Sequence, residues 1–266
     1  VAESAIQDLI SKKPAFILGA YGEACSLVAS DYIKKAKIPA ITISTTNPLI
    51  TANNDYYFRT SFSDSSQGAA LASFAIEKLK AEKIAIIRTT DDDAANAVYK
   101  SFTGKVDTLK KNDNAIVDTE EITLNQLDYT DCLKNIIKSK ATVVFMPVSI
   151  NTAGKIFEKA TELKMFNVIF VGTKDWHEDE FITVSKKYSG IKAVLASDFS
   201  NNVAISEPSA NATAFLKAYQ TKYGEDAVPA TETALAFDAY MLAIKSIEEA
   251  GSTNGTAVRD KLALIK

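Results

Sequence analysis

The sequence predicts an α/β protein whose parallel sheets are flanked by helices. Three observations lead to this fold class: short apolar runs alternate with amphipathic stretches, glycines follow some of the runs, and a polar Ser/Thr/Asn segment follows another. Strands that alternate with helices pair in parallel, and helices then cover both faces of the sheet. Ligands of such sheets bind beyond the carboxyl ends of the strands, so the segments that follow the strands are the first candidates for function.

Composition agrees with a folded globular protein. Of the 266 residues, 47% are hydrophobic and 24% are charged. A chain of this length can form one large domain or two small ones. No stretch approaches the roughly 18 consecutive apolar residues of a membrane span. The formal net charge is -3 and the lysines are interspersed with Asp and Glu, so a nucleic-acid partner is not predicted.

Five apolar runs predict strands, because β-branched residues favour the pleated backbone. They cover residues 15–18, 40–43, 84–87, 143–146 and 168–171. Amphipathic periodicity predicts helices over residues 67–80, 131–138 and 153–163, and another that begins near Ala24. Towards the end of the chain the pattern is helical up to Gly251. There Phe237 and Tyr240 recur at helical spacing with Leu235 and Leu242, which indicates core positions.

The second predicted strand runs into three hydroxyls and an amide, residues 44–47, which we call the 44–47 loop. Pro48 cannot continue an interior strand, so the strand is expected to stop at Thr46 or Asn47. Two interpretations of the hydroxyls remain open. They bind a ligand, or they form a turn by bonding their own backbone.

Two polar segments, residues 58–68 and 196–202, are candidate connections between folding units. Three consecutive aspartates, residues 91–93, follow the third strand. Asp93 is either the N-cap of the next helix or part of a Mg²⁺-binding loop of a phosphoryl-transfer enzyme. Cys25 and Cys132 have no metal-binding or disulfide spacing, and His177, the only histidine, has no positioned nucleophile.

Seven segments, in this order and spacing, resemble the type I periplasmic binding proteins, in particular the branched-chain amino-acid-binding branch, the extracellular ligand-binding receptors of ABC transporters. The resemblance covers nearly the whole chain. The segments read FILGAYGEACSLVAS, IPAITISTTNPLIT, YFRTSFSDSSQGAALASFAIEKL, KIAIIRTTDDD, LDYTDCLKNIIKSKATVVFMPVS, VIFVGTKDW and ATETALAFDAYMLAIKSIEEAG.

The resemblance implies two Rossmann-like lobes with a ligand cleft between them, which closes about a hinge. Lobe I would comprise residues 1–63 and 199–266, and lobe II residues 64–198. Members of the family usually begin with a strand and a helix ahead of the segment that matches residues 1–11, and they end with further strands. We therefore expect the sequence to be truncated at both ends, with lobe I lacking its first strand and helix.

The function that the resemblance implies is that of an extracytoplasmic solute receptor, either periplasmic or lipid-anchored at the cell surface. Its partners would be a small polar solute, namely an amino acid or related compound, and the membrane permease of an ABC importer. No catalytic residue, cofactor or metal is expected. The alternative is a ligand-sensing domain of a signalling receptor with the same fold.

In lobe I, the resemblance implies that Ser44 and Thr46 contact the solute, commonly its carboxylate. The backbone N–H of Ala24, at the start of a helix, suits the same anion. Glu23 occupies a position where the family often has a serine, and its charge would repel a carboxylate. We expect Glu23 either to cap its own helix and face solvent, or to accept a hydrogen bond from a cationic or amide part of the solute.

In lobe II, Asp93 occupies the position of a solute-stacking aromatic residue of the family, and Ser149 follows a strand where the family places another contact. Lys174 stands where the family has an acidic residue that receives the solute's ammonium. If Lys174 points inward it favours an anionic solute, whereas Asp175 beside it would keep an amino acid plausible. Trp176 is interpreted as a packing residue.

Overall fold

The computed structural model describes residues 1–111, 114–123, 125–200 and 210–265, and it divides into two compact units. Unit 1 comprises Val1–Ser63 and Asp198–Lys266, and unit 2 comprises Asp64–Ser197. The sequence predicts boundaries after residues 63 and 198, and the structure places them after residues 63 and 197. Residues 201 and 202 of the predicted second connection lie outside the described residues.

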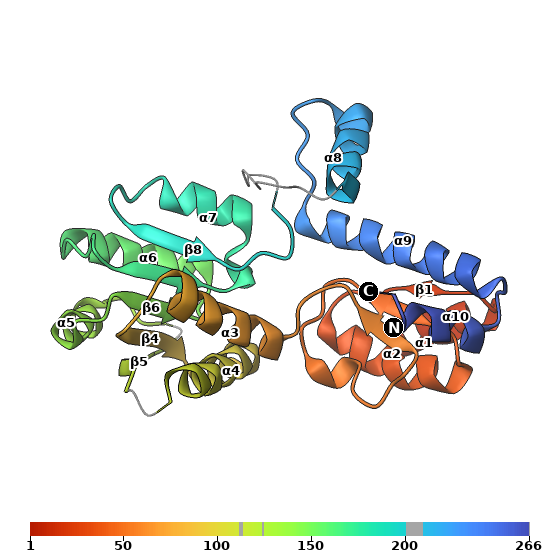
Figure 1. The fold of residues 1–266 in the computed structure, drawn as a ribbon, viewed down its shortest axis with the longest axis horizontal. Coiled ribbons are helices and arrows are strands. Elements are labelled where there is room, and N and C mark those ends of the chain that lie inside the picture. The colour runs from red at the N-terminus through yellow and green to blue at the C-terminus, as the bar shows by residue number, and fades with distance from the viewer. Residues whose placement is uncertain (112–113, 124, 201–209, 266) are drawn as a thin grey trace. The chain divides into compact units, whose positions relative to one another are not determined.

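Unit 1 contains a parallel sheet of order β1-β2-β3, formed by β1 (Ile17–Leu18), β2 (Ala40–Thr42) and β3 (Tyr57–Arg59). Elements from both ends of the chain, drawn in red to orange and in blue in Figure 1, make up this unit. Its helices are α1 (Ala2–Ser11), α2 (Glu23–Ala36), η1 (Pro48–Ile50), α8 (Ala210–Tyr223), α9 (Thr231–Ala250) and α10 (Gly255–Leu262).

Alternate residues of the unit 1 strands face two separate apolar clusters, as the period of two in a strand requires. Ile17 and Ala40 pack with Ile6 of α1 and Ile33 of α2. Ile41 faces the opposite way and packs with Ala239 of α9 and Leu262 of α10. The sheet is therefore covered by α1 and α2 on one face and by α9 and α10 on the other.

The two chain segments of unit 1 are joined by hydrogen bonds. The Phe62 amide donates to Asp198 Oδ1 at 3.0 Å, and Tyr56 Oη lies 2.9 Å from Thr256 Oγ1. Unit 1 is consequently one folded body although residues 64–197 interrupt it in the sequence.

Unit 2 contains a five-stranded parallel sheet of order β5-β4-β6-β7-β8. The strands are β4 (Ile84–Thr89), β5 (Ile116–Ile122), β6 (Val143–Met146), β7 (Ile169–Gly172) and β8 (Lys192–Leu195). The helical elements are α3 (Asp64–Ser73) with its π-helical continuation η2 (Phe74–Lys78), α4 (Asp93–Lys110), α5 (Thr130–Ser139), α6 (Ile150–Glu162), η3 (Lys174–Trp176) and α7 (Glu178–Ser185).

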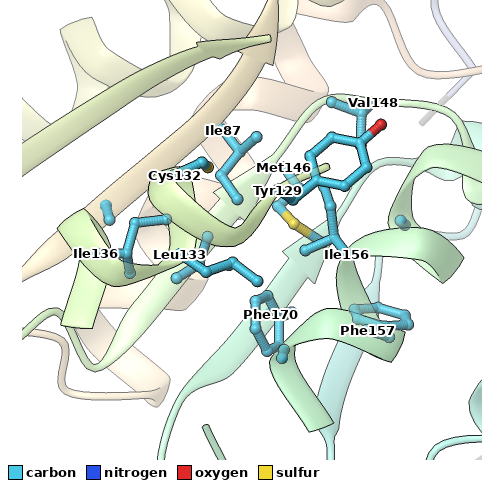
Figure 2. Packing of buried hydrophobic residues seen from close by; sticks show 14 of the residues in the cluster. Ile87, Tyr129, Cys132, Leu133, Ile136, Met146, Val148, Ile156, Phe157 and Phe170 are labelled. Atoms are coloured by element: carbon cyan, nitrogen blue, oxygen red, sulfur yellow. The ribbon is translucent and has the colours of Figure 1, made fainter. Parts of the chain in front are cut away.

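Helices cover both faces of this sheet, as the alternation of strands and helices predicts. Ile86 and Phe145 point towards α3 and α4, where Phe145 stacks on Phe102 with ring centroids 3.9 Å apart. On the other face the cluster shown in Figure 2 includes Ile87 of β4 and Met146 of β6 together with residues of α5 and α6. Unit 2 is thus a three-layer α/β body.

Four predictions about the fold are corrected. The second strand ends at Thr42 rather than at Thr46 or Asn47, because the carbonyl of Thr45 is bonded by side chains instead of by a neighbouring strand. Strand β3 lies partly inside the predicted 58–68 connection, and β5 and β8 were not expected. Tyr240 is 52% exposed rather than in the core, because the buried face of α9 runs through Leu235, Ala239 and Ala243.

None of the described helices combines the length and the apolar character that crossing a membrane requires. Nor do three or more His, Cys, Asp or Glu side chains of the described residues come together in a group that could hold a metal ion.

Candidate functional site

Three segments of unit 1 follow the carboxyl ends of neighbouring parallel strands. Residues 19–22 follow β1, the 44–47 loop comes after β2, and residues 60–63 follow β3. Because the strands are parallel and adjacent, these segments meet at one edge of the sheet. This is the edge at which ligands of open α/β sheets bind.

The first segment is a tight turn that a buried tyrosine holds in place. Gly19 and Gly22 have φ of 130° and 80°, which glycine adopts without strain. Tyr57, 2% exposed, accepts a hydrogen bond from the Ala20 amide at 2.9 Å and donates to the Gly19 carbonyl at 3.1 Å. The backbone of the turn is therefore fixed from β3.

The 44–47 loop is braced from several sides. Thr45 is fully buried and its Oγ1 lies 3.0 Å from Oγ1 of Thr42. The Thr45 carbonyl accepts hydrogen bonds from Ser61 Oγ at 2.6 Å and from Arg59 Nη1 at 3.3 Å. Arg59 Nη2 also donates to the carbonyl of Asn47 at 2.8 Å. Thr45 thus points into unit 1, and its neighbours in the loop are left to face the edge.

Glu23 is the first residue of α2, and its carboxylate does not cap that helix. Oε1 accepts hydrogen bonds from Thr46 Oγ1 at 3.2 Å and from the Asn47 amide at 3.1 Å. The expectation that Glu23 caps its own helix and faces solvent is therefore wrong. The side chain is half-buried and ties α2 to the 44–47 loop.

Ser44 and the first turn of α2 complete the polar edge of unit 1. Ser44 Oγ accepts a hydrogen bond from the Gly22 amide at 3.3 Å. Ala24 lies in the first turn of α2, where backbone N–H groups have no partner within the helix. The structure accordingly brings the four predicted unit 1 residues together, namely Glu23, Ala24, Ser44 and Thr46.

In unit 2, the aspartate that caps α4 is not the one predicted. Asp92 is the N-cap and accepts a hydrogen bond from the Ala95 amide at 3.0 Å, whereas Asp93 is the first helical residue. Asp93 is exposed. The cap falls one residue earlier because Asp92 has the extended backbone that an N-cap requires.

Ser149 has a structural role at the start of α6. It is the N-cap, and its Oγ accepts from the Thr152 amide at 3.3 Å and donates to Thr152 Oγ1 at 3.1 Å. The side chain remains exposed at the carboxyl end of β6. Capping uses one lone pair of Oγ and the bond to Thr152 Oγ1 uses its proton, so one acceptor lone pair is left.

Lys174 and Asp175 form the short η3 turn after β7. The Lys174 amide donates to Gln67 Oε1 at 2.8 Å, and exposed Asp175 accepts from Thr173 Oγ1 at 3.1 Å. Trp176 is fully buried and donates from Nε1 to the Val148 carbonyl at 2.8 Å. Its burial confirms that Trp176 is a packing residue.

Sequence reasoning missed the residues that hold these turns in position. Arg59 and Ser61 brace the 44–47 loop, Tyr57 braces the first turn, and Gln67 binds the η3 backbone. One signal was present, because Arg59 is one of only three arginines and directly follows a strand. The others are ordinary polar residues whose partners lie far away in sequence.

Comparison with known proteins gives one family over almost the entire sequence. Residues 1–265 match the family described as periplasmic binding protein. A search of the curated proteins found no match.

Solved structures with the same fold include several amino-acid receptors. A branched-chain amino acid substrate-binding protein from Streptococcus pneumoniae, solved with isoleucine, is 28% identical, with a TM-score of 0.73. A leucine-binding protein from Thermotoga maritima is 23% identical, with a TM-score of 0.72. In both, the match covers 98% of this chain and 72% of the other. A putative branched-chain amino acid ABC transporter from Rhodospirillum rubrum has a TM-score of 0.83 and is 18% identical. That match covers 98% of this chain and 72% of the other.

Proposed function

The chain belongs to the periplasmic binding protein family, and on this premise we propose that it is the solute receptor of an ABC importer. It acts outside the cytoplasm, in the periplasm or anchored by a lipid, and delivers a small polar solute to a membrane permease. It has no catalytic activity and needs no cofactor. The family assignment over residues 1–265 supports the general solute-binding role.

One observation carries the proposal at the level of residues: the braced 44–47 loop beside the start of α2. A loop that only closed a turn would not need hydrogen bonds from Arg59, Ser61 and Glu23 to hold it. Binding sites gain from such bracing, because side chains fixed beforehand lose little conformational entropy when the ligand arrives. Ser44 and Thr46 supply the polar groups that fix a ligand's orientation.

An amino acid or a related compound is the solute class that we propose. The solved relatives from Streptococcus pneumoniae and Thermotoga maritima are described with isoleucine and as leucine-binding. Unit 1 would contribute Glu23, Ala24, Ser44 and Thr46. Unit 2 offers polar residues at the carboxyl ends of β4, β6 and β7, namely Asp93, Ser149, Lys174 and Asp175.

A thermal-shift screen against amino acids, small amides, carboxylates and polyamines tests the proposal, with isothermal titration of every hit. A ligand present at a hundred times its dissociation constant stabilises the native state by about 2.7 kcal/mol, which is several degrees in Tm for a chain of this size. We expect at least one solute to shift the wild type, and Ser44→Ala and Thr46→Ala to weaken its binding.

Thr221→Ala is the matched control, because Thr221 lies in α8 of the same unit and, among the described residues, its hydroxyl bonds only the Lys217 carbonyl of its own helix. It should bind like the wild type. Binding that is unchanged in Ser44→Ala and Thr46→Ala, or no shift with any solute of the panel, would contradict the proposal.

A further inference from the structure

Glu23 holds the 44–47 loop with one carboxylate oxygen only. Oε1 receives both the Thr46 hydroxyl and the Asn47 amide. Within the described part of the chain, Oε2 has no hydrogen-bond partner. A carboxylate has roughly four lone-pair sites. The loop therefore leaves acceptor capacity on a side chain whose position is already fixed.

The proton of the Thr46 hydroxyl is already donated. A threonine hydroxyl has one proton, and Thr46 gives it to Glu23. Thr46 Oγ1 can consequently accept further hydrogen bonds but cannot donate one to a ligand without losing its bond to Glu23. Thr46 and Glu23 together present two acceptors side by side, which suits a donor group with more than one N–H.

The carboxylate of Glu23 is not held in an ion pair with any lysine, arginine or histidine within the described part of the chain. The guanidinium of Arg59 lies against the same loop, where it donates to the carbonyls of Thr45 and Asn47 and to Thr51 Oγ1. The polar edge of unit 1 thus carries, beside Thr46, a carboxylate that is in no ion pair among the described residues.

This charge decides which end of a solute is accepted there. A solute carboxylate about 4 Å from Glu23, at an effective dielectric constant near 20, would bind roughly a thousandfold more weakly than without the charge. A protonated nitrogen in the same place gains from the charge instead. Donor groups for a carboxylate are the Ser44 hydroxyl and the backbone N–H groups in the first turn of α2, the helix that Glu23 begins.

Resting on the proposed function, we infer that the solute presents a protonated nitrogen, an ammonium or amidinium group, to Glu23 Oε2 and Thr46 Oγ1. Glu23 then determines specificity by charge. The nitrogen can belong to the α-amino group of an amino acid or to the side chain of a cationic amino acid or a diamine. Both sources share the chemistry that the site recognises.

Matched probes separate the nitrogen from the rest of the solute. L-leucine and L-lysine carry both charged groups, isopentylamine and 1,5-diaminopentane lack the carboxylate, and 2-hydroxy-4-methylpentanoate lacks the nitrogen. We expect at least one nitrogen-bearing probe to bind, and the hydroxy acid to bind at least a hundredfold more weakly than that probe. Binding of L-leucine, whose one nitrogen is the α-ammonium, would identify that group, and binding of L-lysine or 1,5-diaminopentane without binding of L-leucine would identify a side-chain or diamine nitrogen.

Glu23→Gln is the decisive variant, because the amide oxygen of Gln can still accept from Thr46 and Asn47 while the charge is lost. We expect this variant to reduce the ratio of the dissociation constants of the hydroxy acid and the nitrogen-bearing probe by at least tenfold. Glu248→Gln removes one charge from an exposed position of α9 in the same unit. It should leave the ratio of the two dissociation constants as in the wild type. Circular dichroism and the melting temperature establish that both variants are folded.

Two results would overturn the inference while the solute-receptor function stands. In the first, the hydroxy acid binds the wild type as tightly as the amines do. In the second, the dissociation constants of the probes have the same ratios in Glu23→Gln as in the wild type. Failure of these probes and of the whole solute panel would overturn both proposals. A solute found in the wider panel that contains no protonatable nitrogen would overturn the inference alone.

Discussion

The ring of Trp176 packs directly against Cα of Gly172: a Cβ on Gly172 would lie 2.2 Å from Cδ2 of the indole. Trp176 is fully buried and also stacks on Phe181, with ring centroids 5.8 Å apart. The ring is therefore enclosed, and it can move away from Gly172 only by displacing side chains such as Phe181. Glycine at 172 sets the position of the turn that carries Lys174 and Asp175.

Gly172→Ala should destabilise unit 2, because the added methyl must displace the indole or the backbone. Overpacking of this kind costs about 1–3 kcal/mol of unfolding free energy. Denaturant unfolding followed by fluorescence of Trp176, the only tryptophan, measures it.

Gly104→Ala in α4 is the matched control, because a Cβ there meets nothing within 4 Å. It should stabilise unit 2 by about 0.5–1 kcal/mol, the usual difference between alanine and glycine in a helix. Equal effects of the two substitutions would show that the contact with Trp176 is not the cause.

Arg59→Lys should loosen the 44–47 loop. Lysine has a single charged nitrogen and cannot reproduce the fork that reaches the carbonyls of Thr45 and Asn47 together. Both carbonyls keep another donor, Ser61 Oγ at Thr45 and the Ile50 amide at Asn47, so the loss of an Arg59 hydrogen bond costs about 0.5–1.5 kcal/mol. Faster hydrogen exchange of the Asn47 amide, together with a lower unfolding free energy of unit 1, is the expected result.

The same change at Arg259 is a suitable comparison. Arg259 pairs with the exposed carboxylates of Asp55 and Asp260, and pairs of this kind contribute little. Arg259→Lys should leave the exchange rate of the loop as it is. Equal exchange in Arg59→Lys and in the wild type would contradict the bracing role.

The two aspartates at the start of α4 should differ in their effect on stability. Asp92→Ala removes the N-cap bond to the Ala95 amide and should cost about 0.5–2 kcal/mol, whereas Asp93→Ala should change stability by no more than about 0.5 kcal/mol. Thermal unfolding of both variants measures the difference. A larger loss in Asp93→Ala would reverse the assignment of the cap.

The two thiols should react at very different rates. Cys25 is exposed, whereas Cys132 is buried, and burial raises the pKa of the Cys132 thiol to about 12. Because the thiolate is the reactive form, DTNB at pH 8 should modify one cysteine rapidly in the native protein and both after denaturation. Rapid modification of two thiols without denaturant would contradict the burial of Cys132, which Figure 2 shows beside Ile87.

The raised pKa of Cys132 also makes stability depend on pH. The unfolded thiol ionises at a pKa of about 8.5, so above that pH the unfolded state binds fewer protons than the folded state. Stability contributed by the neutral thiol is complete below this value and is lost as the pH rises towards about 12. The expected slope is at most about 1.4 kcal/mol per pH unit, and it should be absent in Cys132→Ala.

Much of the fold could be predicted from sequence because strands and helices differ in the period of their apolar residues. Strand β6 matches the predicted residues 143–146, since all four of its side chains are buried. Strand β5 was missed because its Asp and Glu residues break the apolar pattern at the edge of the sheet. Strands at an edge need less burial, so their sequences carry a weaker signal.

The candidate site could be predicted only in part, because its geometry depends on partners that are distant in the chain. Hydroxyls after a strand mark the 44–47 loop. The bond between Glu23 and Thr46 spans 23 positions and leaves no local pattern. Sequence alone therefore predicted the polar edge but not which of its hydrogen-bonding groups are already occupied.

The interruption of unit 1 by unit 2 has a consequence for synthesis on the ribosome. Residues 64–197 are continuous, so all of unit 2 is translated before translation of the second segment of unit 1 begins. The face of the unit 1 sheet that α9 and α10 cover, including Ile41, stays exposed during that interval. Until α9 and α10 have been synthesised, this apolar surface is open to aggregation.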